Sequence, residues 1–146
     1  MDDSKKIMEI IRTEGIIAQL ATLDDEQPWV RPVSPIIEED MTIWITTFCS
    51  SRKVAQIKQN PKICLSFVEP PSGDRSVFVF GSAKIVADPK IKKRIWGICP
   101  FDLVQFFKEG PEDKEYCLLK IEINKIEWWD NWDEGRKVYS PRTKKK

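Results

Sequence analysis

The chain has 146 residues, of which 41% are hydrophobic and 32% charged, and its formal net charge is +1. This length and composition are typical of one globular domain, and the near-neutral charge indicates neither a nucleic-acid partner nor a membrane surface. No run of about 18 apolar residues is present, so we expect no membrane-spanning helix. The N-terminus lacks the apolar segment of a signal peptide, which makes the cytoplasm the expected compartment.

Histidine is absent, and the four cysteines are widely spaced. Without histidine there is no Ser-His-Asp or Cys-His nucleophile system and no imidazole general base. Metal sites usually need close cysteine pairs or histidines, so no metal site is expected. We expect reduced thiols, among which Cys49 stands out because it precedes a basic helix start, a setting that lowers a thiol pKa.

The patterns along the chain predict helices and strands in alternation. Apolar residues at helical spacing predict a helix within residues 3–14 that stops at Gly15. Further helices are expected at 50–60, capped by Ser50 or Ser51, and at 90–96, with a short helical turn at 101–107 beyond Pro100. Strands are expected where β-branched and aromatic residues run between turn signals, at 16–23, 28–37, 41–48, 62–68, 76–86 and 116–129.

Two details concern the last strands. Gly81 is expected at a bulge or bend, and 116–129 alternates, with Leu119, Ile121 and Ile123 on one face. Six strands joined mostly by short turns favour an antiparallel barrel over a parallel sheet. We therefore expect a mainly β chain with peripheral helices, forming one domain over 1–146, with an N-terminal helix in 1–15 and a C-terminal tail at 131–146. The basic run at 142–146 is expected to be a solvated tail.

The segment from Thr46 to Lys53 places hydroxyls and then two cations where a strand turns into a helix. Unpaired N–H groups and the positive end of the helix dipole favour a bound anion at such a point. Arg52 and Lys53 lie in the first turn, the unfavourable end for cations, and a bound phosphate would compensate them. The alternative is a Ser-capped surface helix with two solvated cations.

The residues around this segment resemble a known family. Trp29-Val-Arg31-Pro-Val33-Ser34, the strand ending in Thr47, and Ser51-Arg52-Lys53-Val-x-Gln56-Ile-x-x-Asn60-Pro61 resemble the flavin-binding core of the pyridoxamine 5′-phosphate oxidase family. Gly81-x-Ala83 and Ile126-Glu127-Trp128-Trp129 also fall where that family has similar residues. The resemblance covers roughly residues 16–130, and the general stress protein branch looks most similar.

This resemblance implies an FMN-binding split β-barrel that builds its sites across a homodimer interface. Arg52 and Lys53 would bind the FMN phosphate, with Arg31 beside them and the Ser51 hydroxyl donating. The remaining contacts, to the ring system, would come from the backbone of Val33 and Ser34, from Thr46 and Thr47, and from Trp129 of the second subunit. Six tryptophans and seven phenylalanines, more than one small barrel needs, also favour an apolar interface.

One departure from the family concerns the substrate. The oxidase proper ends in a segment with Arg, His and Asp that holds the vitamin, whereas the segment Asp133–Tyr139 lacks this pattern, so that activity is not expected. The leading hypothesis is an FMN-dependent oxidoreductase acting on an unknown small substrate. The alternative is a non-catalytic flavin carrier or sensor linked to stress. A third, weaker hypothesis is that the barrel binds haem or a deazaflavin, although ordinary His-ligated haem has no ligand here.

Overall fold

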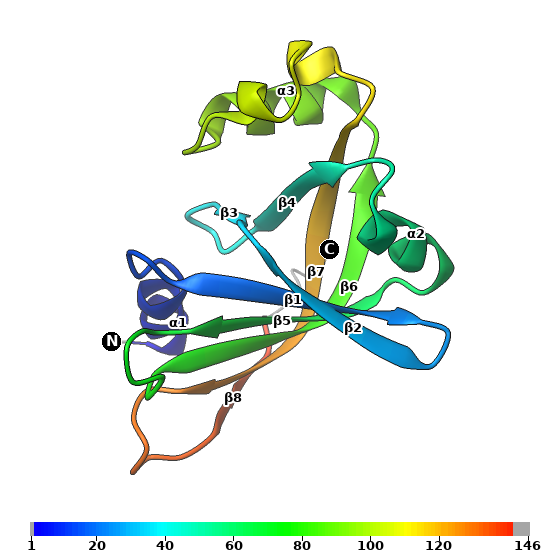
Figure 1. The fold of residues 1–146 in the computed structure, drawn as a ribbon. Helices are drawn as coiled ribbons and strands as arrows, with labels where there is room; N and C mark the ends of the chain where they lie inside the picture. The colour runs from blue at the N-terminus through cyan, green and yellow to red at the C-terminus, as the bar shows by residue number, and fades with distance from the viewer. Residues whose placement is uncertain (1, 142–146) are drawn as a thin grey trace, which may run out of the picture.

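An antiparallel sheet of eight strands organises residues 2–141, the part of the chain that this computed structural model describes (Figure 1). The strands are β1 (Ile17–Asp24), β2 (Gln27–Val33), β3 (Ile36–Ile37), β4 (Ile43–Phe48), β5 (Lys62–Val68), β6 (Ser76–Val86), β7 (Tyr116–Trp129) and β8 (Lys137–Tyr139). Their order is β2-β1-β5-β6-β7-β4-β3, and β8 pairs with β7. The expected antiparallel split barrel is confirmed, whereas the basic run 142–146 lies outside the described residues.

The strand count is eight rather than the expected six. The extended stretch 28–37 divides at Ser34 and Pro35 into β2 and β3, since proline has no N–H to donate to a strand ladder. The second addition is β8, which lies within the segment expected to be a tail and pairs with β7 between Ile126 and Trp128.

The short link between β2 and β3 determines how the barrel closes. These two strands stand at opposite ends of the strand order, yet only Ser34 and Pro35 separate them in the chain. Three Cα–Cα steps span at most about 11 Å. The sheet must therefore curl until its two edges meet at this corner, although β2 and β3 are not themselves paired.

The helices are α1 (Asp3–Ile11), α2 (Arg52–Gln59) and α3 (Pro89–Ile98), and the 3₁₀ turns are η1 (Leu103–Gln105) and η2 (Gly110–Glu112). Asp2 caps α1 by accepting a hydrogen bond from the N–H of Lys5, and the helix ends three residues before the expected end. Figure 1 shows α1 and α2 on opposite sides of the curled sheet, and α3 with the 3₁₀ turns as a separate layer beyond β4. Within residues 2–141, no helix has the length and apolar character needed to cross a bilayer.

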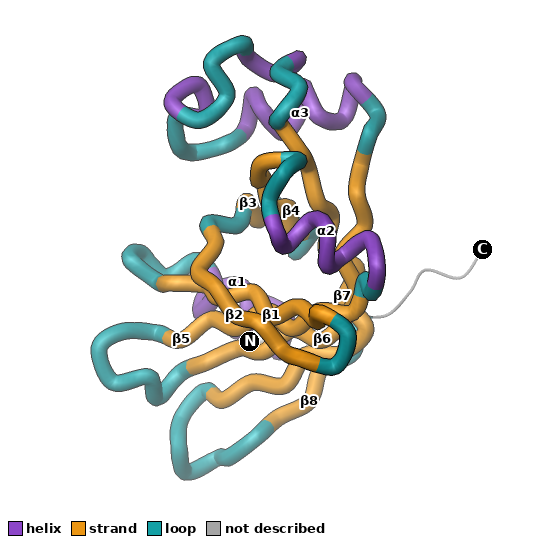
Figure 2. Tube along the Cα trace, turned by 45° about the vertical axis from the view of Figure 1, so that its right-hand side comes forward, coloured by secondary structure: helices purple, strands orange, loops and turns teal. Residues whose placement is uncertain are grey.

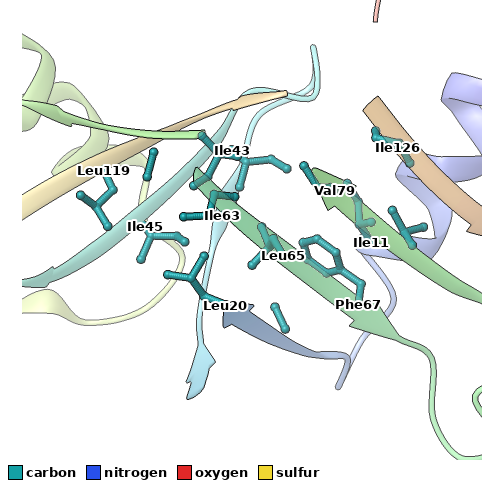
Figure 3. Close-up of a cluster of buried hydrophobic side chains, with 14 of the residues drawn as sticks. Ile11, Leu20, Ile43, Ile45, Ile63, Leu65, Phe67, Val79, Leu119 and Ile126 are labelled. Atoms are coloured by element: carbon teal, nitrogen blue, oxygen red, sulfur yellow. The ribbon is translucent and has the colours of Figure 1, made fainter. Parts of the chain in front are cut away.

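Two apolar clusters share the strands β4 and β7. The larger cluster fills the barrel and includes Ile43 and Leu119 (Figure 3). The second cluster lies under α3 and the 3₁₀ turns and includes Trp44, Tyr116 and Leu118. Neighbouring residues of one strand thus enter different clusters, because successive side chains of a strand point to opposite faces. The second cluster packs the α3 layer against the barrel. Figure 2 shows this layer and the barrel from another side.

Gly81 lies at a bulge, as expected. The β6–β7 register shifts between Phe80, which pairs with Lys125, and Gly81, which pairs with Ile123, so that Asn124 has no partner in β6. A Cβ atom at Gly81 would overlap the carbonyl oxygen of Glu122, and only glycine fits this approach. The extra residue also changes the alternation expected for 116–129. Before the bulge the odd-numbered Leu119 and Ile121 are buried in the barrel cluster, and after it the even-numbered Ile126 and Trp128 are.

Candidate functional site

The N-terminus of α2 is rigidly held but has no side-chain cap. Ser51 occupies the capping position in an extended conformation, and its hydroxyl makes no capping hydrogen bond. The turn before it is fixed by Glu115, whose backbone oxygen accepts from the N–H of Cys49 at 2.8 Å. The Glu115 carboxylate accepts from the N–H and the hydroxyl of Ser50 at 3.1 and 2.9 Å. The backbone donors of this first helical turn are therefore positioned without the partner that a serine cap usually supplies.

Lys53 connects the first turn of α2 to the end of β4. Its Nζ atom donates to Oγ1 of Thr47 at 2.9 Å, and the Thr47 hydroxyl donates to that of Ser51 at 3.4 Å. Burial lowers the pKa of Lys53 below its ordinary value, and the positive charge of Arg31 lowers it further. Each of these causes disfavours the charged ammonium group, so an anion placed beside Lys53 would relieve both.

Arg31 extends from β2 into a buried polar group formed with Thr22 and Gln56. Its guanidinium donates to Oγ1 of Thr22 at 2.8 Å, to the backbone oxygen of Leu20 at 3.2 Å and to Oε1 of Gln56 at 3.0 Å. Thr22 donates to the same Gln56 oxygen. Burial lowers the pKa of Arg31, and the charge of Arg52 adds to this effect. Oxygen atoms without formal charge thus orient Arg31, and its positive charge is not neutralised.

Arg52 is exposed and lies over an aromatic ring. Its guanidinium carbon is 4.5 Å from the ring centroid of Trp29 on β2, a cation–π distance that limits the motion of the side chain. Among the residues that the structure describes, none of Arg31, Arg52 and Lys53 forms an ion pair with a carboxylate. Three uncompensated cations therefore meet at an uncapped helix N-terminus. This donor set fits a phosphate group.

A pocket of about 500 Å³ adjoins this cationic group. Two walls face each other, one from the strands and α2 and the other from the segment after α3. The lining residues are Pro32, Val33, Ser34, Thr46, Thr47, Phe48, Lys53, Phe101, Gln105, Phe106 and Phe107. The structure thus brings five of the residues expected from the sequence into one pocket, from three separate elements. Ser51 is adjacent to the pocket through its hydrogen bond with Thr47, and Arg31 and Arg52 precede the lining residues Pro32 and Lys53 in the chain.

Trp129 is not near this pocket in its own protomer. Thr47 pairs with Cys117 near the start of β7, whereas Trp129 is the last residue of that strand. Its ring packs edge-on against that of Phe78, with the ring centroids 5.7 Å apart. The sequence expectation placed Trp129 in the site of a second subunit, and that stays a prediction.

The cysteines differ in accessibility. Cys49 is exposed directly after β4, and its expected reactivity also stays a prediction. Cys117 is buried on β7. Burial is the larger cause and the neighbouring Cys49 thiol the smaller cause that raise the pKa of Cys117 to about 11. Cys117 therefore remains a protonated thiol at neutral pH.

A larger hollow of about 730 Å³ lies between α1, the turn before β4, and β7. Its lining mixes cations such as Lys5 and Lys120 with the carboxylates of Glu39 and Glu122, and it contains none of the residues expected from the sequence. We take the smaller pocket as the candidate site, because within residues 2–141 it is the one that adjoins both an uncapped helix terminus and cations without an ion-pair partner.

Three site residues were not assigned a role from the sequence. Gln56 is part of the motif that resembles the family, but no role was predicted for it. In the structure its side-chain oxygen accepts a hydrogen bond from Arg31 and orients it. Thr22 contacts Arg31 because β1 and β2 pair, and Trp29 contacts Arg52 because β2 passes close to the start of α2. The aromatic wall from Phe101 to Phe107 carried no sequence signal beyond that of a short helical turn.

Comparison with known proteins agrees with this picture. Residues 2–145 match the family described as pyridoxamine 5′-phosphate oxidase like. No match was found among curated proteins. General Stress Protein 26 of Bacillus anthracis has a similar structure, with a TM-score of 0.77 and 23% identity over 96% of this chain and 99% of that one. A protein related to general stress protein 26 from Clostridium acetobutylicum has a TM-score of 0.77 and 19% identity, covering 97% of each chain.

A FAD-binding protein from Mesorhizobium loti is also similar, with a TM-score of 0.65 and 16% identity over 95% of this chain and 96% of that one. At these identities the structural likenesses establish the fold alone. The family match spans nearly the whole chain, and with the observed split barrel it leads to one conclusion: the chain belongs to the pyridoxamine 5′-phosphate oxidase-like family.

Proposed function

We propose that the protein binds FMN, with the phosphate at the N-terminus of α2 and the ring system in the adjoining pocket. One observation carries the proposal: Arg31, Arg52 and Lys53 converge without a carboxylate partner on an uncapped helix terminus. The pocket volume of about 500 Å³ is in the range of small-molecule and cofactor sites.

Each part of the site has a separate task in this proposal. Lys53 and Arg52 neutralise the phosphate, the Ser51 hydroxyl and the first N–H groups of α2 donate to its oxygens, and Arg31 adds charge from the buried side. Val33, Ser34, Thr46 and Thr47 provide backbone and hydroxyl groups along one wall for the polar edge of the ring system.

We further propose that the protein is an FMN-dependent oxidoreductase that acts on a small substrate. Bound FMN would supply the hydride or electron transfer, and the residues of the pocket would bind and orient the cofactor. A flavin carrier or sensor without turnover is the alternative, and it uses the same binding residues. Proteins with this fold also include an F420 reductase and a heme binding protein from Mycobacterium smegmatis, so these cofactors belong in the same binding test.

The test is a flavin titration of the purified protein, in which binding is measured by the quenching of flavin fluorescence. Replacing both Arg52 and Lys53 by Ala should weaken FMN binding by about two to four decades, since each charge-assisted hydrogen bond to phosphate is worth on the order of 1.5–3 kcal/mol. Riboflavin lacks the phosphate, so its weaker affinity should hardly change. Lys58→Ala is the matched control, because it removes an exposed cation from the last turn of the same helix.

Equal FMN affinity in the wild type and the double variant would refute the phosphate site. Tighter binding of haem or of F420 than of FMN would refute the choice of cofactor. Reduction of the bound flavin by NADH or NADPH, followed by reoxidation with an added acceptor, separates the oxidoreductase from the carrier.

A further inference from the structure

The pocket has a second wall that the binding of FMN does not account for. Phe101, Gln105, Phe106 and Phe107 come from the segment between α3 and β7, and they face the wall that carries Lys53. In Figure 1 this segment lies in the separate layer beyond β4. The proposed phosphate and ring contacts come from β2, β4, α2 and the serines Ser34 and Ser51 beside them. We therefore consider a second molecule for the aromatic wall.

The aromatic wall contains three phenylalanine rings, of which Phe107 is buried and Phe106 is exposed. Phe107 is buried, and its ring centroid lies 5.1 Å from that of Phe48 and 5.3 Å from that of Tyr116. Phe106 packs on Phe107 at 6.5 Å in an edge-on arrangement but remains 48% exposed at the pocket. An aromatic ring stacked on Phe106 would cover apolar surface that otherwise faces water.

The charges of the pocket restrict what this molecule can be. Of the described residues that line the pocket, only Lys53 is charged, and the proposed function already pairs it with the FMN phosphate. The aromatic wall offers neither a cation for an anionic substrate nor a carboxylate for a cationic one. Its polar group is the Gln105 amide, whose Nε2 donates to the backbone oxygen of Asp102 at 3.0 Å. A charged group placed here would lose water without gaining a partner.

We propose that this wall is the substrate subsite and that it takes a planar aromatic molecule without net charge, such as a neutral quinone, stacked against Phe106. The inference rests on the proposed function, because it places the substrate beside the FMN ring. It distinguishes this protein from an enzyme that acts on a phosphorylated vitamin, for which the subsite has no counter-charge.

The experiment uses FMN-loaded protein and two probes that share one planar ring system, naphthoquinone and naphthoquinone sulfonate. Binding of each to the oxidised protein is followed through the change in flavin absorbance. The neutral quinone should bind at least about tenfold more tightly than the sulfonate. A tenfold difference corresponds to about 1.4 kcal/mol, and removing a charged group from water without giving it a partner costs more free energy than that. Phe106→Ala should weaken naphthoquinone about tenfold and leave FMN affinity within about twofold.

Val104→Ala is the matched control. Val104 is 50% exposed on the same 3₁₀ turn, close to the exposure of Phe106, but it does not line the pocket. Retained FMN absorbance and an unchanged unfolding midpoint show that each variant is folded.

The possible outcomes separate the two proposals. Wild-type protein that does not take up FMN refutes the proposed function and with it this inference. Protein that takes up FMN but binds both quinones equally, or in which Phe106→Ala behaves as Val104→Ala does, overturns the subsite alone. A change in oligomeric mass in Phe106→Ala would assign Phe106 to an interface between two copies and would also overturn the subsite.

Discussion

The ammonium group of Lys53 donates a hydrogen bond to the hydroxyl of Thr47 across 2.9 Å, so the first turn of α2 and the end of β4 meet inside the pocket. Because burial and Arg31 lower the pKa of Lys53, part of its charge is lost at a lower pH than the ordinary value of 10.5. In the proposed site, FMN, which carries close to two negative charges above about pH 7, would bind the charged form of the lysine. The proposal therefore predicts that FMN binding depends on pH.

The first prediction concerns that dependence. FMN affinity should fall as the pH rises towards 10.5, the ordinary pKa of lysine, because the lowered pKa of Lys53 removes its charge before that point. The Lys53→Met variant should bind FMN more weakly at all pH values and show a flatter profile. The stability of the flavin-free protein should change in the opposite sense. Between the two pKa values the unfolded chain holds the Lys53 proton and the folded chain does not, so stability relative to Lys53→Met rises with pH. Denaturant melts and FMN titrations across this range measure both, and parallel profiles in the two proteins would contradict the assignment.

The second prediction concerns Gln56. Its Oε1 atom accepts from Arg31 and Thr22, and its buried Nε2 atom has no partner among the described residues. Gln56→Glu replaces the unpartnered amide by a carboxylate that pairs with Arg31. We expect the flavin-free protein to gain about 1 kcal/mol of stability and FMN affinity to fall about tenfold, because Arg31 is then neutralised. Gln56→Met, which removes both acceptor and donor, is the control. Stronger FMN binding in Gln56→Glu would show that Arg31 does not act on the phosphate.

The third prediction tests the bulge that sets the β6–β7 register. Gly81→Ala should lower the free energy of unfolding by about 3 kcal/mol or more, because the added methyl group meets the backbone of Glu122 rather than a movable side chain. Gly97→Ala is the matched control in α3, where an added Cβ meets nothing within 4 Å. It should raise stability by about 0.5–1 kcal/mol. Similar effects at both glycines would contradict the close approach at Gly81.

The fourth prediction concerns assembly. The flavin-bound protein should have twice the mass of a single 17.0 kDa chain by light scattering, with the flavin at the interface between two copies. Trp129→Ala should then weaken FMN binding although Trp129 lies away from the pocket of its own protomer. Trp132→Ala, which removes a tryptophan that is 79% exposed, should have no effect. A flavin-bound protein with the mass of one chain would contradict the prediction.

The fifth prediction concerns the activity that names the family. Neither pyridoxine phosphate nor pyridoxamine phosphate should be converted at a useful rate, because the segment Asp133–Tyr139 lacks the Arg, His and Asp pattern of the oxidase. In this chain part of that segment forms β8, which pairs with β7. Steady formation of pyridoxal phosphate with oxygen as acceptor, measured by absorbance, would show that another part of the chain binds these substrates.

Much of the site could be predicted because its signals are local. Hydroxyls followed by Arg52 and Lys53 at a strand-to-helix junction indicate an anion site on electrostatic grounds alone. Val33 and Thr47 were assigned by resemblance, and the structure places them in one pocket with Lys53. Most strands and helices also lie close to where the patterns placed them, and the helices are followed by stop signals at Gly15, Pro61 and Pro100.

The remainder depends on contacts between distant segments, which periodicity does not encode. Trp29 lies over Arg52 because β2 passes close to the start of α2. Phe106 lines the same pocket as Thr47 because the segment after α3 packs on the second apolar cluster. The change of alternation after Gly81 was likewise invisible, because a bulge shifts the parity of a strand without changing its composition. The strand β8 is three residues long and too short for any alternation to indicate it.

The unpaired corner between β2 and β3 has a mechanical consequence. A sheet resists widening because widening breaks hydrogen bonds between strands, but at this corner the two edges share none. Movement at this corner breaks no hydrogen bond between β2 and β3 and requires only changes in side-chain packing and in the backbone torsion angles of Ser34 and Pro35. Val33 and Ser34 stand on one side of the corner and Thr46 on the other, all of them lining the pocket. We therefore expect the pocket to change its width at this corner, and a rigid planar molecule lying across the corner to stiffen it.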